Sequence, residues 1–166
     1  MKPIDEWKIY EFVNKSGLIL IRNPFTCVGQ KYWIVRCLRD YPNAPNRNNL
    51  TENIYKEYNF DTKKSWWDIL NKCTKNTNRK LKLKKSLRWT TLGYQHDWNT
   101  KVYSEDLKSP FPHDLATMTE FFANVLNYNN FKSEAAIVNY YPIGSSLAPH
   151  TDHSEANLNA PLFSLR

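Results

Sequence analysis

Apolar residues in the first half of the chain change their spacing, and each change predicts a different element. The run 17–21 is mostly apolar and precedes an Asn-Pro pair, which is typical of a short strand. From 26 to 41 the large apolar side chains recur at helical spacing and prolines follow, which predicts a helix. The range 51–73 also has a helical pattern but is polar, and we expect a break in it near Asn59.

Strand patterns flank one helix in the second half of the chain. Residues 87–93 alternate as a strand does, and 103–112 form a loop with two prolines. Pro112 begins a helix whose apolar face is expected to hold Leu115, Met118, Phe122 and Val125. Residues 135–141 form a further β run, and 146–152 a second extended segment. Helices first and strands later favour an α+β fold with a late β core.

Composition narrows the class of protein. A chain of 166 residues suits one domain, and a hydrophobic share of 41% argues against intrinsic disorder. No apolar stretch is long enough to span a membrane, and residues 1–10 lack the apolar run of a secretory signal. Cys27, Cys37 and Cys73 are widely spaced, which fits buried thiols in a reducing compartment better than a disulfide framework. We therefore expect a monomeric intracellular protein with no membrane contact.

Positive charge is concentrated in one stretch. The formal net charge is +7, and no acidic residue occurs between residues 69 and 96. The basic residues of this stretch are Lys72, Lys75, Arg79, Lys80, Lys82, Lys84, Lys85 and Arg88. Basic residues bind phosphates, and neighbouring aromatic residues can stack on bases. We expect 76–85 to be a basic, mobile loop; nucleic-acid contact and a solvated lysine-rich linker both remain open for it.

The stretch 139–152 carries the candidate chemistry. On a strand, His150 and Asp152 point to the same face, where they would supply two ligands of a 2-His-1-carboxylate Fe(II) site. Taken alone, the pair is better explained as a surface turn. Asn139 and Tyr141 also share a strand face, and an amide and a phenol there can hydrogen-bond a dicarboxylate on the metal. The alternative for these two is an edge strand with a core tyrosine.

Asn-x-Tyr, with His-x-Asp starting nine positions after the tyrosine, resembles the pattern of the AlkB family of Fe(II)/2-oxoglutarate dioxygenases. The resemblance, which is strongest to the branch of the first animal homologue, covers nearly the whole chain. The segments that carry it include 21–25, 87–94, 109–112, 134–141 and 150–155. It implies a double-stranded β-helix, or jelly roll, behind an N-terminal helical extension. The extension with its basic segment would occupy 1–86, and 87–166 would begin the dioxygenase domain.

The resemblance also assigns roles to residues. It implies that His150 and Asp152 are iron ligands and that Asn139 and Tyr141 contact 2-oxoglutarate. The implied reaction is oxidative demethylation of a modified base in tRNA or DNA, with Asp152 as the catalytic carboxylate. The cofactors would then be Fe(II) and 2-oxoglutarate, and the partner a nucleic acid. The resemblance also implies a place in the nucleus, the cytoplasm or the mitochondrion, where members of the family occur.

A flipped base needs a recognition surface, because the base must leave its stack to reach the iron. By the resemblance, residues 89–103 form a lid over the substrate. The substrate-contacting residues would be Trp89, Tyr94 and Trp98, with Arg88 on a phosphate and Glu155 on an exocyclic amine. Packing of the lid onto the domain and a plain surface acid are the alternatives for the aromatic residues and Glu155. No ligand role is given to His96, His113 or His153.

The resemblance departs from the family pattern at the C-terminus. Family members use a second histidine and a late arginine from later strands, whereas this chain ends at Arg166. We therefore expect an incomplete jelly roll, present as an N-terminal portion of a demethylase and inactive as written. The alternative is a pseudoenzyme that binds nucleic acid through its basic segment. A zinc module built on His150, Asp152, His153 and a cysteine ranks last because it lacks ligand spacing.

Overall fold

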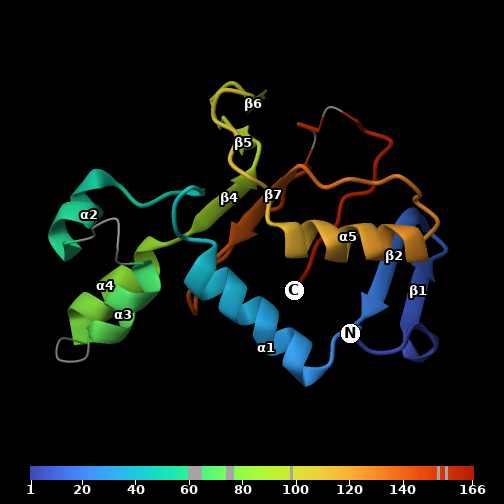
Figure 1. The fold of residues 1–166 in the computed structure, drawn as a ribbon, viewed down its shortest axis with the longest axis horizontal. Helices are drawn as coiled ribbons and strands as arrows, with labels where there is room; N and C mark the ends of the chain where they lie inside the picture. The colour runs from blue at the N-terminus through green and yellow to red at the C-terminus, as the bar shows by residue number, and fades with distance from the viewer. Residues whose placement is uncertain (60–64, 74–76, 98, 153, 156) are drawn as a thin grey trace.

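The computed structural model describes residues 1–59, 65–73, 77–97, 99–152, 154–155 and 157–166, and it has mixed helices and strands (Figure 1). This confirms the α+β class. In chain order the elements are η1 (Ile4–Glu6), β1 (Lys8–Phe12), β2 (Lys15–Arg22), α1 (Cys27–Val35), η2 (Arg36–Asp40), β3 (Arg47–Asn48), α2 (Glu52–Tyr58), α3 (Trp66–Lys72), α4 (Thr77–Ser86), β4 (Trp89–Gly93), β5 (Gln95–His96), β6 (Tyr103–Ser104), α5 (His113–Val125) and β7 (Ala135–Asn139).

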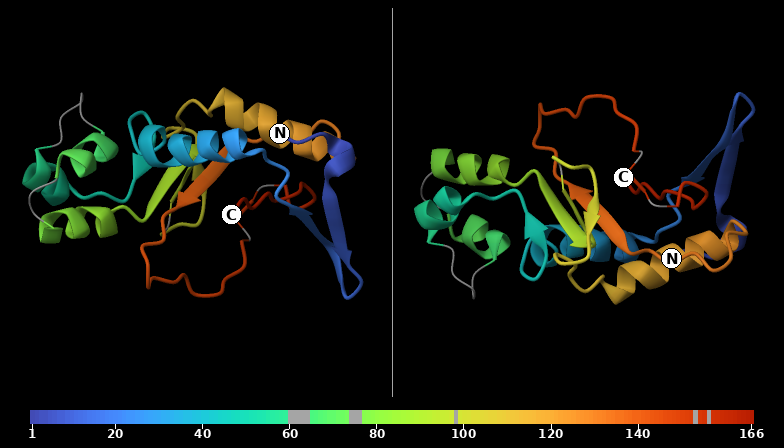
Figure 2. Two further views of the ribbon diagram at one scale, coloured as in Figure 1. Left: turned by 90° about the horizontal axis from the view of Figure 1, so that it is seen from below. Right: turned by 90° about the horizontal axis from the view of Figure 1, so that it is seen from above.

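A three-stranded antiparallel sheet in the order β3-β4-β7 forms the centre of the molecule. Four of the five residues of β4 are buried, because β4 has a partner on either side. Helices α1 and α5 lie on one face of this sheet, and the segment after β7 passes over the other (Figure 2). Leu92 of β4 packs with Met118 and Phe122 of α5 in the core beneath the helices. The sheet therefore separates a helical side from the side that carries the His-x-Asp stretch.

Helix α5 confirms its predicted pattern. Pro112 is its N-cap, and the buried residues of its apolar face include Leu115, Met118 and Phe122. Helix α1 and the π-helical turn η2 together cover 27–40, which confirms the helix predicted over 26–41.

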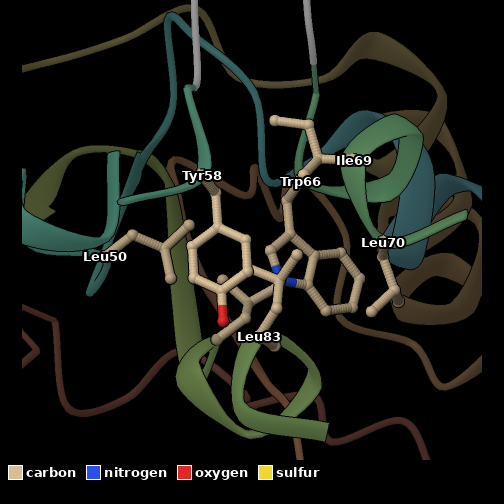
Figure 3. Close-up of a cluster of buried hydrophobic side chains, with 7 residues drawn as sticks. Leu50, Tyr58, Trp66, Ile69, Leu70 and Leu83 are labelled. Carbon is tan, nitrogen blue, oxygen red and sulfur yellow. The ribbon is translucent and has the colours of Figure 1, made fainter. Parts of the chain in front are cut away.

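The region around α2, α3 and α4 has a hydrophobic core of its own. Figure 3 shows Tyr58 of α2, Trp66 of α3 and Leu83 of α4 pointing toward one another in this core. The predicted break at Asn59 is present, since this residue ends α2 in the left-handed conformation with φ 51°. The indole N–H of Trp66 donates to the Leu83 carbonyl at 3.1 Å, which joins α3 to α4.

The predicted mobile loop over 76–85 is wrong, because 77–86 is helix α4. Leu83 and Leu87 lie one turn apart and are fully buried, so the lysines between them project from a helix that is anchored on one side. The Ser86 carbonyl accepts a 2.7 Å bond from the Asn49 side chain, which satisfies one of the orphan groups at the helix end. Lys75 lies outside the described residues.

We expect Leu83→Ala to lower the free energy of unfolding by about 3 kcal/mol, because it opens a cavity between Tyr58 and Trp66. Leu81→Ala on the same helix is the matched control. Leu81 is 46% exposed, so its truncation should change stability by less than about 1 kcal/mol. Urea unfolding followed by circular dichroism measures both. Equal losses in the two variants would contradict the packing described for α4.

Two sequence expectations about strands need correction. The run 17–21 is confirmed as part of β2, but it pairs with β1, which the sequence analysis did not predict. This hairpin precedes every long helix, so helices do not come first. The segment 146–152 is not a strand and pairs with no strand in the described part of the chain. It contains Pro149, which has no N–H to donate to a ladder.

The cysteines and the helices bear on the expected environment. All three cysteines are free thiols; Cys27 is exposed and the other two are half-buried, so the expectation of buried thiols is wrong for Cys27. Among the described residues, no helix combines the length and the apolar character that crossing a membrane requires.

A charged cluster fixes α5 against η2. Arg36 donates from Nε and Nη2 to the two carboxylate oxygens of Asp114, at 2.7 and 3.1 Å. Its third nitrogen, Nη1, lies 2.9 Å from Asp40, and the Tyr32 hydroxyl donates to Asp114 at 2.6 Å. Burial raises the pKa of Asp114, but the bonds from Arg36 and Tyr32 outweigh it and hold that pKa below its ordinary value.

We expect Asp114→Asn to cost about 2 kcal/mol of stability near neutral pH, because Arg36 loses its bidentate partner. A depressed carboxyl pKa stabilises the fold above the unfolded pKa of about 3.9 and loses that contribution as the pH falls through the folded pKa. The difference between wild type and variant should therefore shrink on acidification below about pH 4. Urea unfolding at several pH values tests this, with exposed Asp106→Asn as the control. A difference independent of pH would contradict the assignment.

Candidate metal centre

His150 and Asp152 lie side by side, and both side chains are exposed to solvent. The Nε2 atom of His150 is 3.5 Å from Oδ1 of Asp152, and the two side chains are 53% and 57% exposed. The predicted proximity of the pair is therefore present, although the strand that was expected to produce it is not. The chain is extended here without strand pairing.

A backbone carbonyl orients the imidazole ring. Nδ1 of His150 lies 2.9 Å from the Ala148 carbonyl oxygen. A carbonyl oxygen only accepts, so Nδ1 is the donor in this contact. Nε2 is the ring nitrogen that faces Asp152, and it offers a lone pair when it carries no proton. Histidines that bind metals usually donate their other ring N–H in this way.

The donor set fits a metal ion in type and spacing. A lone pair that faces a carboxylate is unfavourable unless a proton or a cation lies between them. Neighbouring ligand atoms about 2.1 Å from one metal ion are about 3 Å apart, close to the separation of this pair. The described residues contain no group of three or more His, Cys, Asp or Glu side chains placed for one metal, so this part of the chain supplies two donors. His153 lies outside it.

Glu155 contacts the lid. The Tyr103 hydroxyl on β6 donates to Oε1 of Glu155 at 2.7 Å, across 52 residues of sequence. Burial, this hydrogen bond and the nearby carboxylates of Glu155 and Asp152 raise the pKa of Tyr103, so the phenol stays protonated and remains a donor. This contact joins the β5–β6 hairpin to the His-x-Asp stretch.

A second group of predicted site residues gathers at the other end of β4. Trp89 begins β4 and pairs with Asn139, the last residue of β7. The Tyr140 N–H donates to the Arg88 carbonyl at 2.8 Å, so the pairing continues one residue beyond β4. Asn139 and Tyr141 are both exposed, in keeping with a shared face, although β7 ends before Tyr141.

The two groups of predicted residues remain apart. Three residues of β4 lie between Trp89 and Gly93, and a strand rises about 3.4 Å per residue. The lid predicted over 89–103 is wrong for 89–93, because these residues are β4 of the sheet, and the name is kept for 94–103. Within the described part of the chain, neither Asn139 nor Tyr141 makes a hydrogen bond to His150 or Asp152. Contacts of Asn139 and Tyr141 with 2-oxoglutarate therefore stay a prediction.

The lid aromatics differ in their surroundings. Lys108 Nζ lies 3.8 Å from the centre of the Tyr94 ring, and the Tyr94 hydroxyl donates to Glu105. One face of this ring is thus covered by Lys108, which lies after the lid in the chain, as the packing alternative requires. Trp98 lies outside the described residues.

Comparison with known proteins decides the family. The family model described as the 2OG-Fe(II) oxygenase superfamily matches residues 17–166. The chain belongs to this superfamily. Its cofactors are the Fe(II) and 2-oxoglutarate of the description, which agrees with the imidazole–carboxylate pair. The family match also begins before residue 87, whereas the sequence analysis placed the start of the dioxygenase domain there.

Similar curated proteins carry related names. The chain is 36% identical over 164 residues to mouse "Nucleic acid dioxygenase ALKBH1" and 35% identical to the human protein of that name; in both cases 99% of the chain and 42% of the relative are covered. It is 34% identical over 170 residues to "tRNA demethylase abh1" of Schizosaccharomyces pombe, with 95% of the chain and 56% of the relative covered. The chain thus spans about two fifths to just over half of the length of these superfamily members.

Sequence reasoning missed two features of this superfamily member's site. Tyr103 was placed in the lid but given no role, because nothing near it indicates a partner 52 residues away. The Ala148 carbonyl that orients His150 is backbone, and no side-chain pattern reports it.

Proposed function

We propose that the protein is an Fe(II)- and 2-oxoglutarate-dependent oxidative demethylase of modified bases in nucleic acid. The observation that carries the proposal is the His150–Asp152 pair, 3.5 Å apart, inside the segment that matches the superfamily. The names of the similar proteins point to nucleic acid as the substrate class, with tRNA and DNA both represented.

The finer fold assignment belongs to the same proposal. We assign β4 and β7 to a double-stranded β-helix, because an antiparallel sheet with a helical layer on one side leaves its other face for the site. The chain after β7 passes over that free face, and this part of the chain includes the His-x-Asp stretch.

Each residue of the pair has a defined task. His150 would offer Nε2 to the iron while the Ala148 carbonyl holds the ring, and Asp152 would add a carboxylate oxygen. When bound, Fe(II) with 2-oxoglutarate supplies the oxidation of a methyl C–H bond by dioxygen. Tyr103 holds Glu155 and so joins the lid to the segment that carries this pair. Oε2 of Glu155 remains for an exocyclic amine of the base.

Substrate and cosubstrate contacts complete the proposal. Trp89, together with Tyr94 and Trp98, would contact the flipped base, and Arg88 would contact a phosphate. Asn139 and Tyr141 would bind 2-oxoglutarate. The cross-strand pairing of Trp89 with Asn139 supports this proposal, because it places a residue for the base next to a residue for 2-oxoglutarate.

The test asks whether 2-oxoglutarate turnover is coupled to demethylation. It uses the protein that the natural transcript encodes. Incubated with Fe(II), 2-oxoglutarate and a methylated RNA or DNA oligonucleotide, it should release succinate in step with loss of the methyl group. Succinate release with no change in any methylated nucleic acid would contradict nucleic acid as the substrate class, but it would support the oxygenase activity. Absence of both would contradict the proposal.

A further inference from the structure

Helix α4 presents a basic surface that the proposed chemistry does not use. We define the basic α4 face as Lys80, Lys84, Lys85 and Arg88. Lys84 and Lys85 are exposed in the last turn of α4, Lys80 is half-buried one turn earlier, and Arg88 is exposed between α4 and β4. None of the four makes an ion pair within the described part of the chain.

The other two basic residues of α4 are already engaged. Lys82 donates to both carboxylate oxygens of Glu57, at 2.8 and 3.0 Å. Arg79 donates to the Glu57 carbonyl at 2.7 Å, and its guanidinium lies 4.8 Å from the centre of the Tyr58 ring. These residues fasten α4 to α2, and the charges left over are those of the basic α4 face.

The helix holds this face in a fixed place. Leu83 and Leu87 are fully buried beneath it, and Figure 3 shows Leu83 beside Trp66. The Leu83 carbonyl accepts bonds from the Trp66 indole and the Ser86 hydroxyl. The Tyr58 hydroxyl donates to the Arg79 carbonyl at 2.9 Å. Because the backbone is already ordered, a bound polyanion has only the lysine side chains to immobilise.

The face also leads toward the proposed site. Arg88 is followed directly by Trp89, the first residue of β4 and the cross-strand partner of Asn139. A nucleic acid strand with its phosphates on Lys84 and Lys85 would therefore continue past Arg88 to Trp89. Fixed cations that are left without acidic partners bind phosphates through release of counterions.

We propose that the basic α4 face binds the phosphate backbone of nucleic acid outside the modified nucleotide. The inference relies on the proposed function only for its choice of polyanion. Its test needs neither Fe(II) nor 2-oxoglutarate, so its failure is distinct from a loss of turnover.

The test compares two double variants that each remove two positive charges. Lys84→Gln with Lys85→Gln changes the basic α4 face, whereas Lys8→Gln with Lys15→Gln changes the β1–β2 hairpin at the opposite end of the molecule (Figure 1). All four lysines are exposed, so both variants should fold, and circular dichroism checks this. The probe is a short fluorescein-labelled RNA stem-loop, with binding followed by anisotropy between about 50 and 200 mM KCl.

We expect the α4 variant to bind the stem-loop about tenfold more weakly at low salt, with a log–log salt slope smaller by roughly 1.5. The hairpin variant should stay within about twofold of wild type, because salt screens charges more than about 10 Å away. Unchanged binding by the α4 variant, or equal losses in both variants, would overturn the proposal. A third result would also overturn the proposal: the α4 variant binds RNA as wild type does but loses binding to phosphatidylserine vesicles. The basic α4 face would then bind a membrane surface.

Discussion

Gly93→Ala should strongly destabilise the fold. Gly93 ends β4 with φ +73°, and a Cβ there would lie 2.0 Å from the Glu134 carbonyl oxygen and 2.8 Å from the Phe111 ring. The Glu134 oxygen cannot retreat freely, because it accepts a 3.0 Å bond from the Tyr94 N–H. Backbone strain and this clash together should cost about 4 kcal/mol or more, a large share of the stability of an ordinary domain.

The control for this prediction is Gly144→Ala. Gly144 has φ +83°, but a Cβ there meets nothing within 4 Å, so only the backbone strain of about 1 kcal/mol remains. Thermal and urea unfolding of the two variants measure the difference. A Gly93→Ala protein as stable as the Gly144→Ala protein would show that β4 does not approach Glu134 as described.

Asp152→Ala should abolish 2-oxoglutarate turnover while leaving the fold intact. The side chain is 57% exposed and its partner in the structure is His150, so removing it costs little packing. The proposed iron site loses one of the two ligands found in the described part of the chain. A loss of at least about a hundredfold follows, because even supporting residues of metal sites contribute 10- to 100-fold. Succinate release by the protein as its own transcript encodes it is the measurement.

Asp5→Ala is the matched control for that variant, because Asp5 is an exposed carboxylate in η1, outside the proposed site. It should keep wild-type turnover. An Asp152→Ala protein with the turnover of the control would exclude Asp152 from the iron site, whatever its fold.

Helical spacing and strand alternation predicted most of the fold, because these elements are determined by the spacing of apolar residues within a single segment. Leu115, Met118 and Phe122 recur every three or four residues, and this repeat is the face that α5 buries. Helix α4 was not predicted, because its lysines outweigh Leu81 and Leu83 in the average hydrophobicity of the segment. Its stability comes from Leu83 and Leu87 packing around Trp66, a contact between segments.

The candidate site shows the same limit. The sequence placed His150 beside Asp152, and the structure agrees, but through an extended segment without strand pairing. The Tyr103–Glu155 bond joins residues with no local relation, so no spacing rule reports it. The cross-strand pairing of Trp89 with Asn139 depends on the register of β4 and β7, which is set by burial on both strands.

Iron binding tests the central claim most directly. The protein as its own transcript encodes it is loaded with Fe(II) without oxygen, passed through a desalting column and assayed for iron per chain. We expect about one iron per wild-type chain, and loss of it in both His150→Ala and Asp152→Ala, because each variant removes one member of the pair. The Asp5→Ala control should keep its iron. Iron retained in both site variants, or none bound by the wild type, would contradict the assignment of His150 and Asp152 as its ligands.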